Sequence, residues 1–321
     1  MLQTDANGEE RGIAMVKRMI SALMLLGVIL LPYAGGVQAE DHFKPFVLAS
    51  RGAGDFDTRV QETRDALIGA GFEIVGEYTP YADTFVDNAR VIIVTNDELK
   101  TVAGKTAHGG FAAPWRVAVT KTGDEVQVAY VNPIYIAYGY RLESDLNGVS
   151  EGLKRALGAQ QTFGSEKGLT ERKLRKYRYT FGMEYFEDVY RLAEYGSHKE
   201  AVTAIEKNLA EGRGGVTKVY RLDLGNDVTV FGVARKAPLD GDEHMDEAWI
   251  MENVDFKEIK GTAYLPYEIL VDGGDVVALH MRFRMALHNP DLKMMGKNSF
   301  MQIMPSPKAS ETAFKAAAGG Q

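Results

Sequence analysis

Apolar runs separated by polar turns occur in two stretches of the chain that match each other. In the first stretch, apolar runs at 116–120 and 126–131 flank a polar turn, and in the second the runs are 267–271 and 276–285. Short apolar runs that are bounded by turn residues predict β-strands, so each stretch predicts an antiparallel hairpin. Aligned along these hairpins, the two stretches need a gap of only two residues. A pattern that recurs in this way indicates one structural unit used twice.

The pattern around the first hairpin predicts a complete unit of mixed secondary structure. A strand is expected at 45–50, followed by an amphipathic helix at 58–70 that ends at Gly71. Two further strands are expected at 72–78 and 91–95, and further helices at 97–103 and 149–157. The main order is therefore strand, helix, four strands and helix.

The second unit repeats this order. Its first strand is expected at 185–192, where the aromatic spacing also fits a helix. Ser197 and Glu200 have the spacing of a capping box, in which both side chains satisfy free amide groups at the start of a helix that runs to Leu209. The remaining expected elements are strands at 216–222 and 228–233, an acidic insertion at 239–247 and a final helix at 310–317.

Several short motifs resemble the family named domain of unknown function 302. They are Ala66-Leu67 and Gly71-Phe72 around the end of the first helix, Pro114 before the strand 117–119, and Val131-Asn132-Pro133 after the last strand. The resemblance covers residues 45–158 well and 185–318 loosely, because the second copy has Arg282-Phe283 in place of Asn132-Pro133. It implies a curved, mainly antiparallel sheet packed on helices, like the saddle of the TATA-binding protein, and no established activity.

The repeat and the resemblance together predict an α+β fold of two homologous domains, each in the order β-α-β4-α and related by a pseudo-twofold axis. The first domain is expected at 40–158 and the second at 185–321, with a polar connector at 159–184. A chain of 321 residues is long enough for two domains of this size.

The N-terminal residues 1–39 have the pattern of a secretory signal peptide. Lys17-Arg18 precedes an apolar run at 19–31, and small residues precede an expected cleavage after Ala39. An uncleaved anchor is the alternative, but the apolar run is shorter than the roughly 20 residues that span a bilayer. The acidic residues before Lys17 do not suit a signal peptide, so either Met1 or Met15 is the start. We therefore expect a periplasmic or secreted protein that meets the membrane only through this segment.

Composition excludes several classes of function. The chain has no cysteine, which excludes disulfides, a thiolate nucleophile, iron–sulfur clusters and covalently attached c-type haem. Its net charge is −7 and its Lys and Arg residues are interpreted as scattered, which argues against nucleic acid as a partner. The sequence leaves open a homodimer, and it identifies neither the ligand nor a protein partner.

Catalytic motifs are incomplete throughout the chain. Gly52 and Gly54 begin a dinucleotide-binding pattern, but Asp57 stands where the third glycine is required. Gly104-Lys105-Thr106 resembles the end of a phosphate-binding loop, but Leu99 replaces its first glycine. We therefore expect a non-catalytic binding or accessory protein. An enzyme with its site between the repeats, using His108 or a buried carboxylate, is one alternative.

Aromatic residues gather on and after the first hairpin, together with two arginines. Such a set can line an apolar cleft that has a few polar anchors, or it can form a packed seam between the two repeats. The candidate ligand-binding residues are Trp115, Arg116, Tyr130, Tyr135, Tyr138 and Arg141.

A second alternative is a copper-handling protein. The segment 280–304 contains two of the six histidines and six of the thirteen methionines. On an unbroken strand, His280 and His288 would share one face. Imidazole and thioether groups suit copper(I), although Met281 and Met285 also fit an ordinary core strand. The candidate metal ligands are His280, His288, Met294 and Met295, and no other cofactor is predicted.

Overall fold

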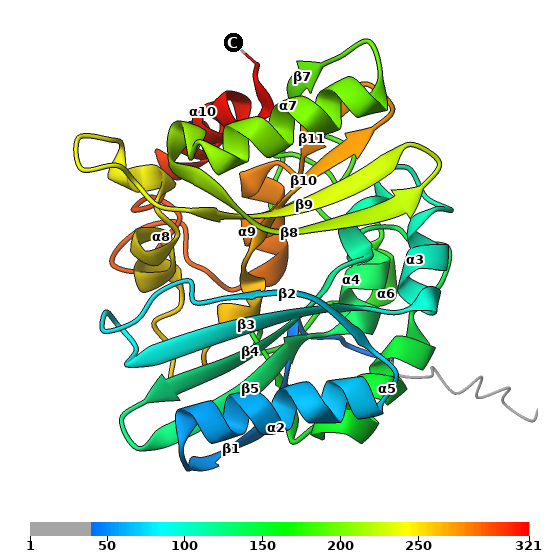
Figure 1. Ribbon diagram of the computed structural model, residues 1–321. Helices are drawn as coiled ribbons and strands as arrows, with labels where there is room; N and C mark the ends of the chain where they lie inside the picture. The colour runs from blue at the N-terminus through cyan, green and yellow to red at the C-terminus, as the bar shows by residue number, and fades with distance from the viewer. Residues whose placement is uncertain (1–39, 321) are drawn as a thin grey trace, which may run out of the picture. The chain divides into compact units, whose positions relative to one another are not determined.

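Two antiparallel sheets that share one strand order form the framework of the protein (Figure 1). The computed structural model describes residues 40–320, so the expected signal peptide lies outside the described residues. The first sheet has the order β2-β3-β4-β5-β1-β6, and the second has the order β8-β9-β10-β11-β7. The predicted α+β class is confirmed. The homology of the two halves and their division into two domains stay predictions.

The first sheet is built around the predicted hairpin, in which Val117 lies opposite Tyr130. A short strand from the expected connector pairs with β1 and adds a sixth strand at the sheet edge. The strands are β1 (Phe46–Ala53), β2 (Glu73–Tyr78), β3 (Asn88–Thr95), β4 (Trp115–Thr122), β5 (Glu125–Val131) and β6 (Gln161–Phe163).

The second sheet contains the other two hairpins that the sequence predicts. The turn between its two longest strands places Asn226 and Asp227 at φ 49° and 57°, the left-handed conformation that a tight hairpin turn requires. The strands are β7 (Tyr190–Glu194), β8 (Val216–Gly225), β9 (Val228–Arg235), β10 (Tyr267–Asp272) and β11 (Asp275–Ala278).

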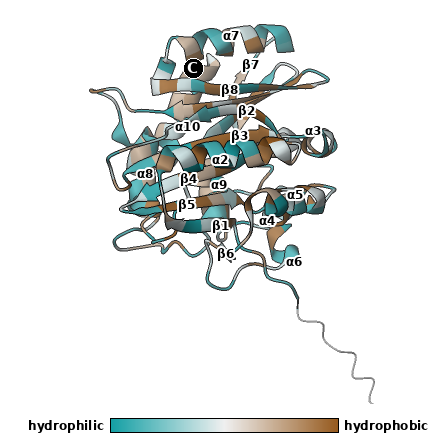
Figure 2. Ribbon diagram, turned by 60° about the horizontal axis from the view of Figure 1, so that its bottom comes forward, coloured by the Kyte–Doolittle hydropathy of each residue, from teal (hydrophilic) through white to brown (hydrophobic). Residues whose placement is uncertain are grey.

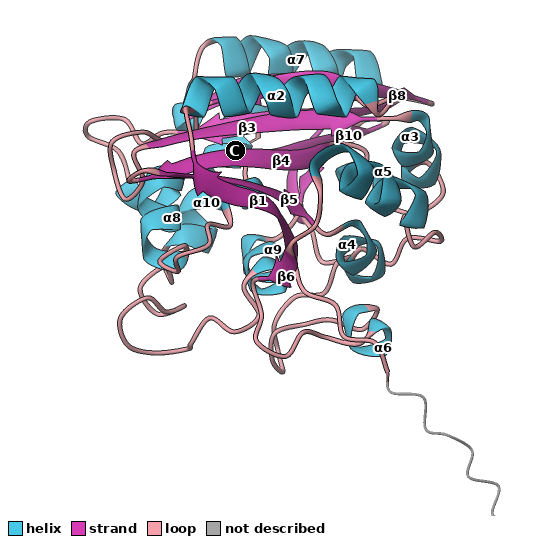
Figure 3. Ribbon diagram, turned by 90° about the horizontal axis from the view of Figure 1, so that it is seen from below, coloured by secondary structure: helices cyan, strands magenta, loops and turns pink. Residues whose placement is uncertain are grey.

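Helices cover the sheets, and α2 and α7 lie along the same side of the strands (Figure 3). Hydrophobic residues concentrate in the central strands, whereas α7 is largely hydrophilic (Figure 2). The helices are α2 (Phe56–Gly69), α3 (Asp97–Ala103), α4 (Pro133–Gly139), α5 (Asn147–Leu157), α6 (Glu171–Leu174), α7 (His198–Ala210), α8 (Glu247–Val254), α9 (Met281–His288) and α10 (Ser306–Ala318). Among residues 40–320, no helix combines the length and the hydrophobicity needed to cross a membrane.

The predicted strand at 276–285 is wrong, because β11 ends at Ala278 and α9 follows. The side chain of His280 caps this helix by accepting a hydrogen bond from the backbone N of Arg282 at 3.2 Å. Every residue of α9 except Arg282 is buried, so its sequence lacks the one-sided periodicity that marks a surface helix. His280 therefore occupies the capping position before α9 that Asn132 occupies before α4.

The predicted acidic insertion at 239–247 contains regular secondary structure. It contains the 3₁₀-helix η3 (Glu243–Met245) and the start of α8. Asp246 caps α8, since its carboxylate accepts a hydrogen bond from the backbone N of Ala248 at 2.8 Å. Asp246 and Glu247 thus lie at the start of a helix, where negative charge is favourable.

Each half of the chain places a 3₁₀-helix against the sheet of the other half. The helix η1 (Gly109–Ala112) lies against β9 and β10, and a Cβ atom on Gly110 would be 2.6 Å from Cδ1 of Leu270. The helix η4 (Thr262–Tyr264) lies against β4, where Thr120 donates a hydrogen bond of 2.9 Å to Oγ1 of Thr262. The two sheets therefore complete one continuous core between them.

The edge strands β2 and β8 of the two sheets also lie side by side (Figure 1). A Cβ atom on Gly76 in β2 would be 2.7 Å from Cβ of Tyr220 in β8. Such a distance is shorter than any normal carbon–carbon contact, so the close approach of the two edges depends on glycine at this position.

Candidate ligand pocket

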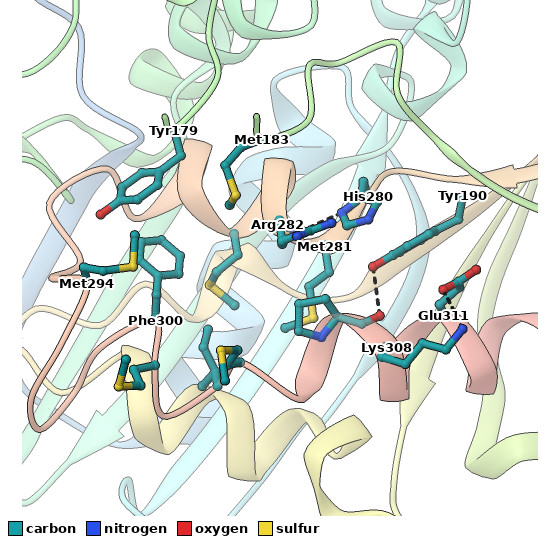
Figure 4. A pocket seen from close by; sticks show the side chains of 15 residues that line it. Tyr179, Met183, Tyr190, His280, Met281, Arg282, Met294, Phe300, Lys308 and Glu311 are labelled. Atoms are coloured by element: carbon teal, nitrogen blue, oxygen red, sulfur yellow. Dashed lines mark hydrogen bonds and ion pairs between the residues drawn. The ribbon is translucent and has the colours of Figure 1, made fainter. Parts of the chain in front are cut away.

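A pocket of about 410 Å³ lies beside α9 and the start of α10 (Figure 4). This volume falls in the range of about 300–1,000 Å³ that is typical of small-molecule sites. The lining residues are Tyr179, Met183, Tyr190, His280, Met281, Arg282, Met285, Met294, Phe300, Met301, Ile303, Met304, Pro307, Lys308 and Glu311.

Four separate segments of the chain form this pocket, and side-chain hydrogen bonds hold them together. The hydroxyl of Tyr190, in β7, donates to the carbonyl of Pro307 in α10 at 2.8 Å. The hydroxyl of Tyr179 donates to the carbonyl of Leu292 at 3.3 Å, and its ring lies 4.6 Å from that of Phe300. These contacts fix both ends of the pocket to the core.

Methionine side chains dominate the pocket walls. Met281 and Met285 are buried in α9, whereas Met294, Met301 and Met304 are exposed on the segment that follows it. Met183 comes from the chain before β7 and completes the set of six. Methionine is unbranched and polarizable, so such a wall adapts to ligands of different shape.

Polar side chains gather at one end of the pocket. Arg282 forms an ion pair with Glu184, and Nε2 of His280 lies 3.4 Å from the same carboxylate. Lys308 is 3.2 Å from Glu311. Figure 4 shows His280, Arg282 and Glu311 at this end, and Met294 with Phe300 at the other.

His280 lies at this polar end, where burial disfavours the charged form of its imidazole. Burial is the largest influence and lowers its pKa, Glu184 opposes this effect, and Arg282 lowers the pKa further. Its ring centroid lies 4.2 Å from that of Tyr190, which holds the imidazole in place. A neutral imidazole at neutral pH can exchange hydrogen bonds with a ligand without carrying charge.

A second pocket, of about 530 Å³, shares His280 with the first. Its walls carry His108 and six carboxylates, and burial lowers the pKa of His108. Within residues 40–320, no group of three or more His, Asp and Glu side chains is placed to hold a metal ion. The carboxylates of this pocket are Glu184, Glu187, Asp188, Glu194, Asp272 and Asp275.

The structure does not bring the four predicted metal ligands together. His288 is buried elsewhere, where its Nδ1 donates to the carbonyl of Arg284 at 2.9 Å. Burial, together with Arg284 and Arg116, holds the pKa of His288 well below its usual range. Met295 is exposed and does not line the pocket, and His280 and Met294 lie at opposite ends of it (Figure 4).

The six predicted ligand-binding residues lie in packed regions and line none of the pockets described above. Trp115 donates from Nε1 to the carbonyl of Val131 at 2.9 Å, and Tyr130 donates to the carbonyl of Gly158 at 3.3 Å. Tyr135 donates to the carbonyl of Leu287 at 2.7 Å and so joins α4 to α9. Of these three contacts, only that of Tyr135 crosses between the two halves, as the seam alternative requires, and the other two lie within the first half.

The outer members of that set are less buried. Tyr138 is half-buried, and its ring meets that of Phe43 at 5.3 Å. Arg141 pairs with Glu187 at 2.8 Å. Arg116 is the exception, because it points into the centre of the seam.

A buried charge cluster occupies this centre. Nη1 of Arg116 is 2.6 Å from Oε1 of Glu268, and Nη2 of Arg284 is 3.1 Å from Oε2 of the same carboxylate. The guanidinium of Arg284 also lies over the rings of Tyr264 and Tyr267, at 4.4 and 4.3 Å. These three charged side chains are buried, so this part of the junction is packed. His108, which the enzyme alternative names, lines the second pocket together with residues of the other half, and that alternative stays a prediction.

Several pocket residues were not predicted from the sequence. Tyr179 and Met183 lie in or next to the expected connector, and Tyr190 was assigned only to a strand. The available signal was the density of methionine in 280–304, which does contain five of the six wall methionines. The methionine density did not show that the chain near Tyr179 lines the same pocket as the segment 280–304.

Comparisons with protein-family models, with curated proteins and with solved structures find no match. The resemblance to the domain of unknown function 302 family therefore stays a prediction. Function has to be argued from the geometry of the pocket.

Proposed function

We propose that this is an exported, non-catalytic binding protein that holds a small, largely apolar ligand in the methionine-lined pocket. The observation that carries the proposal is the pocket itself, whose walls hold six methionines, two tyrosines, a phenylalanine and an isoleucine. Its volume of about 410 Å³ suits a small organic molecule.

The polar end defines the ligand further. Arg282 and Lys308 each have a carboxylate partner already, so a free anion gains little from either cation. Nδ1 of His280 is used in capping α9, so a hydroxyl, carbonyl or amide group of a ligand would meet Nε2, whose contact with Glu184 is long at 3.4 Å. We therefore propose an elongated apolar ligand with one uncharged polar end, which lies against His280.

Export is supported by the sequence pattern of residues 17–39. A basic pair, an apolar run and small residues follow one another there in the order of a signal peptide. The lack of cysteine is compatible with any compartment, because the protein needs no disulfide to form its core. The mature chain is proposed to begin at Glu40.

Titration with the neutral fluorescent probe N-phenyl-1-naphthylamine tests the pocket. Met301→Glu places a carboxylate on the apolar wall, and we expect its affinity for the probe to fall at least about tenfold, because an unpaired charge next to an apolar ligand is unfavourable. Met295→Glu is the matched control, because Met295 is exposed on the same segment but does not line the pocket. Equal probe affinities for both variants would overturn the proposal.

A second candidate function is copper(I) handling, because six thioethers and the imidazole of His280 surround one pocket. Copper(I) would be the cargo, and thioether and imidazole groups are suitable ligands for it. Competition with bicinchoninate, using protein purified without an affinity tag, tests this function. Copper(I) uptake that is lost in His280→Ala supports it, and no uptake excludes it.

A further inference from the structure

Two segments of this acidic protein carry only positive charge. Residues 172–183 contain five Lys and Arg residues, residues 293–308 contain three, and neither segment contains Asp or Glu. The chain as a whole has a net charge of −7. The expectation that basic residues are scattered is therefore wrong for 172–178, where all five cations of the first segment lie.

Most of these cations are open to solvent. Lys173, Lys176, Lys293 and Lys297 are exposed, and in the part of the chain that the structure describes no carboxylate lies within 4.0 Å of them. Arg178 is half-buried, and its guanidinium lies 5.3 Å from the centre of the Phe181 ring. Their charge is thus available to a partner.

The same segments concentrate exposed hydrophobic side chains. Five of the eight large hydrophobic residues that are exposed among residues 40–320 belong to them. The exposed fractions are 90% for Phe181, 47% for Met294, 67% for Met295, 52% for Met301 and 69% for Met304. Apolar groups gathered in this way indicate an interaction surface, whereas scattered ones do not.

Contacts of Tyr179 connect the end of the first segment to the second. Its hydroxyl donates to the carbonyl of Leu292, next to Lys293, and its ring packs on Phe300. Both segments also contribute side chains to the methionine-lined pocket, so the pocket opens on this surface. We call residues 172–183 and 293–308 together the basic apolar face.

We propose that the basic apolar face docks the protein on the surface of a bilayer that contains anionic lipids. Lysine and arginine are attracted to the negative lipid headgroups, while Phe and Met side chains enter the boundary between headgroups and acyl chains. Nucleic acid is a poorer match, because its phosphates reward the cations but leave four exposed methionines in water. This proposal does not depend on what the pocket binds.

Vesicle flotation tests the docking surface. The protein used is residues 40–321, since residues 41–321 form one compact unit that does not include the apolar N-terminal run. We expect it to float with vesicles of phosphatidylcholine and phosphatidylglycerol, and not with phosphatidylcholine alone. The binding should weaken as salt is raised, because ions screen the attraction.

Two variants separate the charged and apolar contributions. Lys173→Gln with Lys176→Gln removes two charges, and we expect roughly 30-fold weaker binding from about 1 kcal/mol per cation. Phe181→Ser should weaken binding roughly tenfold, through loss of apolar burial. The matched controls are Lys199→Gln with Lys207→Gln on α7, and Leu239→Ser, which alter exposed side chains outside the face.

Three outcomes would overturn the proposal. They are no flotation with anionic vesicles, equal losses in the control variants, and binding to an RNA oligonucleotide that depends on the same lysines while vesicles are ignored. Probe titration without vesicles reports on the pocket separately. A failure of docking is therefore distinguishable from a failure of the proposed ligand site.

Discussion

Arg116 in β4 and Glu268 in β10 form an ion pair of 2.6 Å in which both side chains are almost fully buried, and they are equivalent positions in the predicted repeat, where Pro114 matches Pro266. Equivalent positions of two similar units meet only near the axis that relates them, as in an isologous dimer. Two identical charged residues at such a place would repel each other. Because one half carries Arg and the other Glu, the halves attract at their junction, and Arg284 adds a second cation.

Glu268→Gln should destabilise the protein by about 3–5 kcal/mol, because it leaves Arg116 and Arg284 buried without their carboxylate. Urea unfolding, followed by tryptophan fluorescence, measures the loss. Glu206→Gln is the control, since Glu206 pairs with Lys218 near the surface and such pairs contribute at most about 1 kcal/mol. Equal losses in the two variants would show that the buried pair has no special role.

Glu247 should make stability depend on pH. It is buried in α8, and burial raises its pKa to about 8, although Arg235 opposes the shift. In the unfolded chain a glutamate has a pKa of about 4.3. The folded protein therefore holds the proton more tightly, so the stability from Glu247 is full below the unfolded pKa and is lost as the pH rises through about 8.

Glu247→Gln removes this pH dependence, because glutamine stays neutral. We expect the stability of the variant relative to the natural protein to increase by about 4 kcal/mol between about pH 5 and about pH 9. Urea unfolding at both pH values measures this difference. A difference that stays constant would mean that Glu247 is ionised across the whole range.

Gly76→Ala should cost about 1–3 kcal/mol, because the added Cβ would lie 2.7 Å from Cβ of Tyr220 and force β2 and β8 apart. Gly52→Ala is the matched control, since Gly52 also lies in a strand and an added Cβ there would meet nothing within 4 Å. Thermal and urea unfolding compare the two variants. A harmless Gly76→Ala substitution would show that the edges are not in close contact.

Residues 40–158 should not fold alone, because η4 of the second half covers β4 of the first. We expect this fragment to lack near-ultraviolet circular dichroism and a cooperative urea transition. Mixing it with residues 159–321 should restore both signals, since each fragment then regains the cover that the other supplies. A cooperative transition of the isolated fragment would contradict the shared core.

Local patterns in the sequence were enough to predict most strands. The hairpin of β4 and β5 and the helix start at Ser197 depend on neighbouring residues, and the structure contains both, with Oγ of Ser197 accepting a hydrogen bond from the backbone N of Glu200 at 3.3 Å. The helix α9 was missed for the opposite reason. It is buried on almost every side, and Met281, Phe283 and Met285 alternate with two arginines, of which Arg282 is exposed and Arg284 is buried.

The sequence indicated only part of the candidate pocket. The methionines of 280–304 were recognised as unusual, but the polar end depends on Glu184, which lies far away in the chain. Likewise, Arg116 was assigned to a ligand site because no local pattern shows that Glu268 faces it across the seam. Contacts between distant segments are set by tertiary packing, which leaves little trace in one sequence.

The exchange of η1 and η4 between the two sheets also sets when the chain can fold. Synthesis proceeds from the N-terminus, so β1 to β6 all leave the ribosome before Tyr264, the last residue of η4, has been added. Until then the first sheet lacks η4, which covers β4, so we expect that it does not fold stably. In the proposed export of an unfolded chain, this delay would keep the leading half extended enough to pass through a narrow translocation channel.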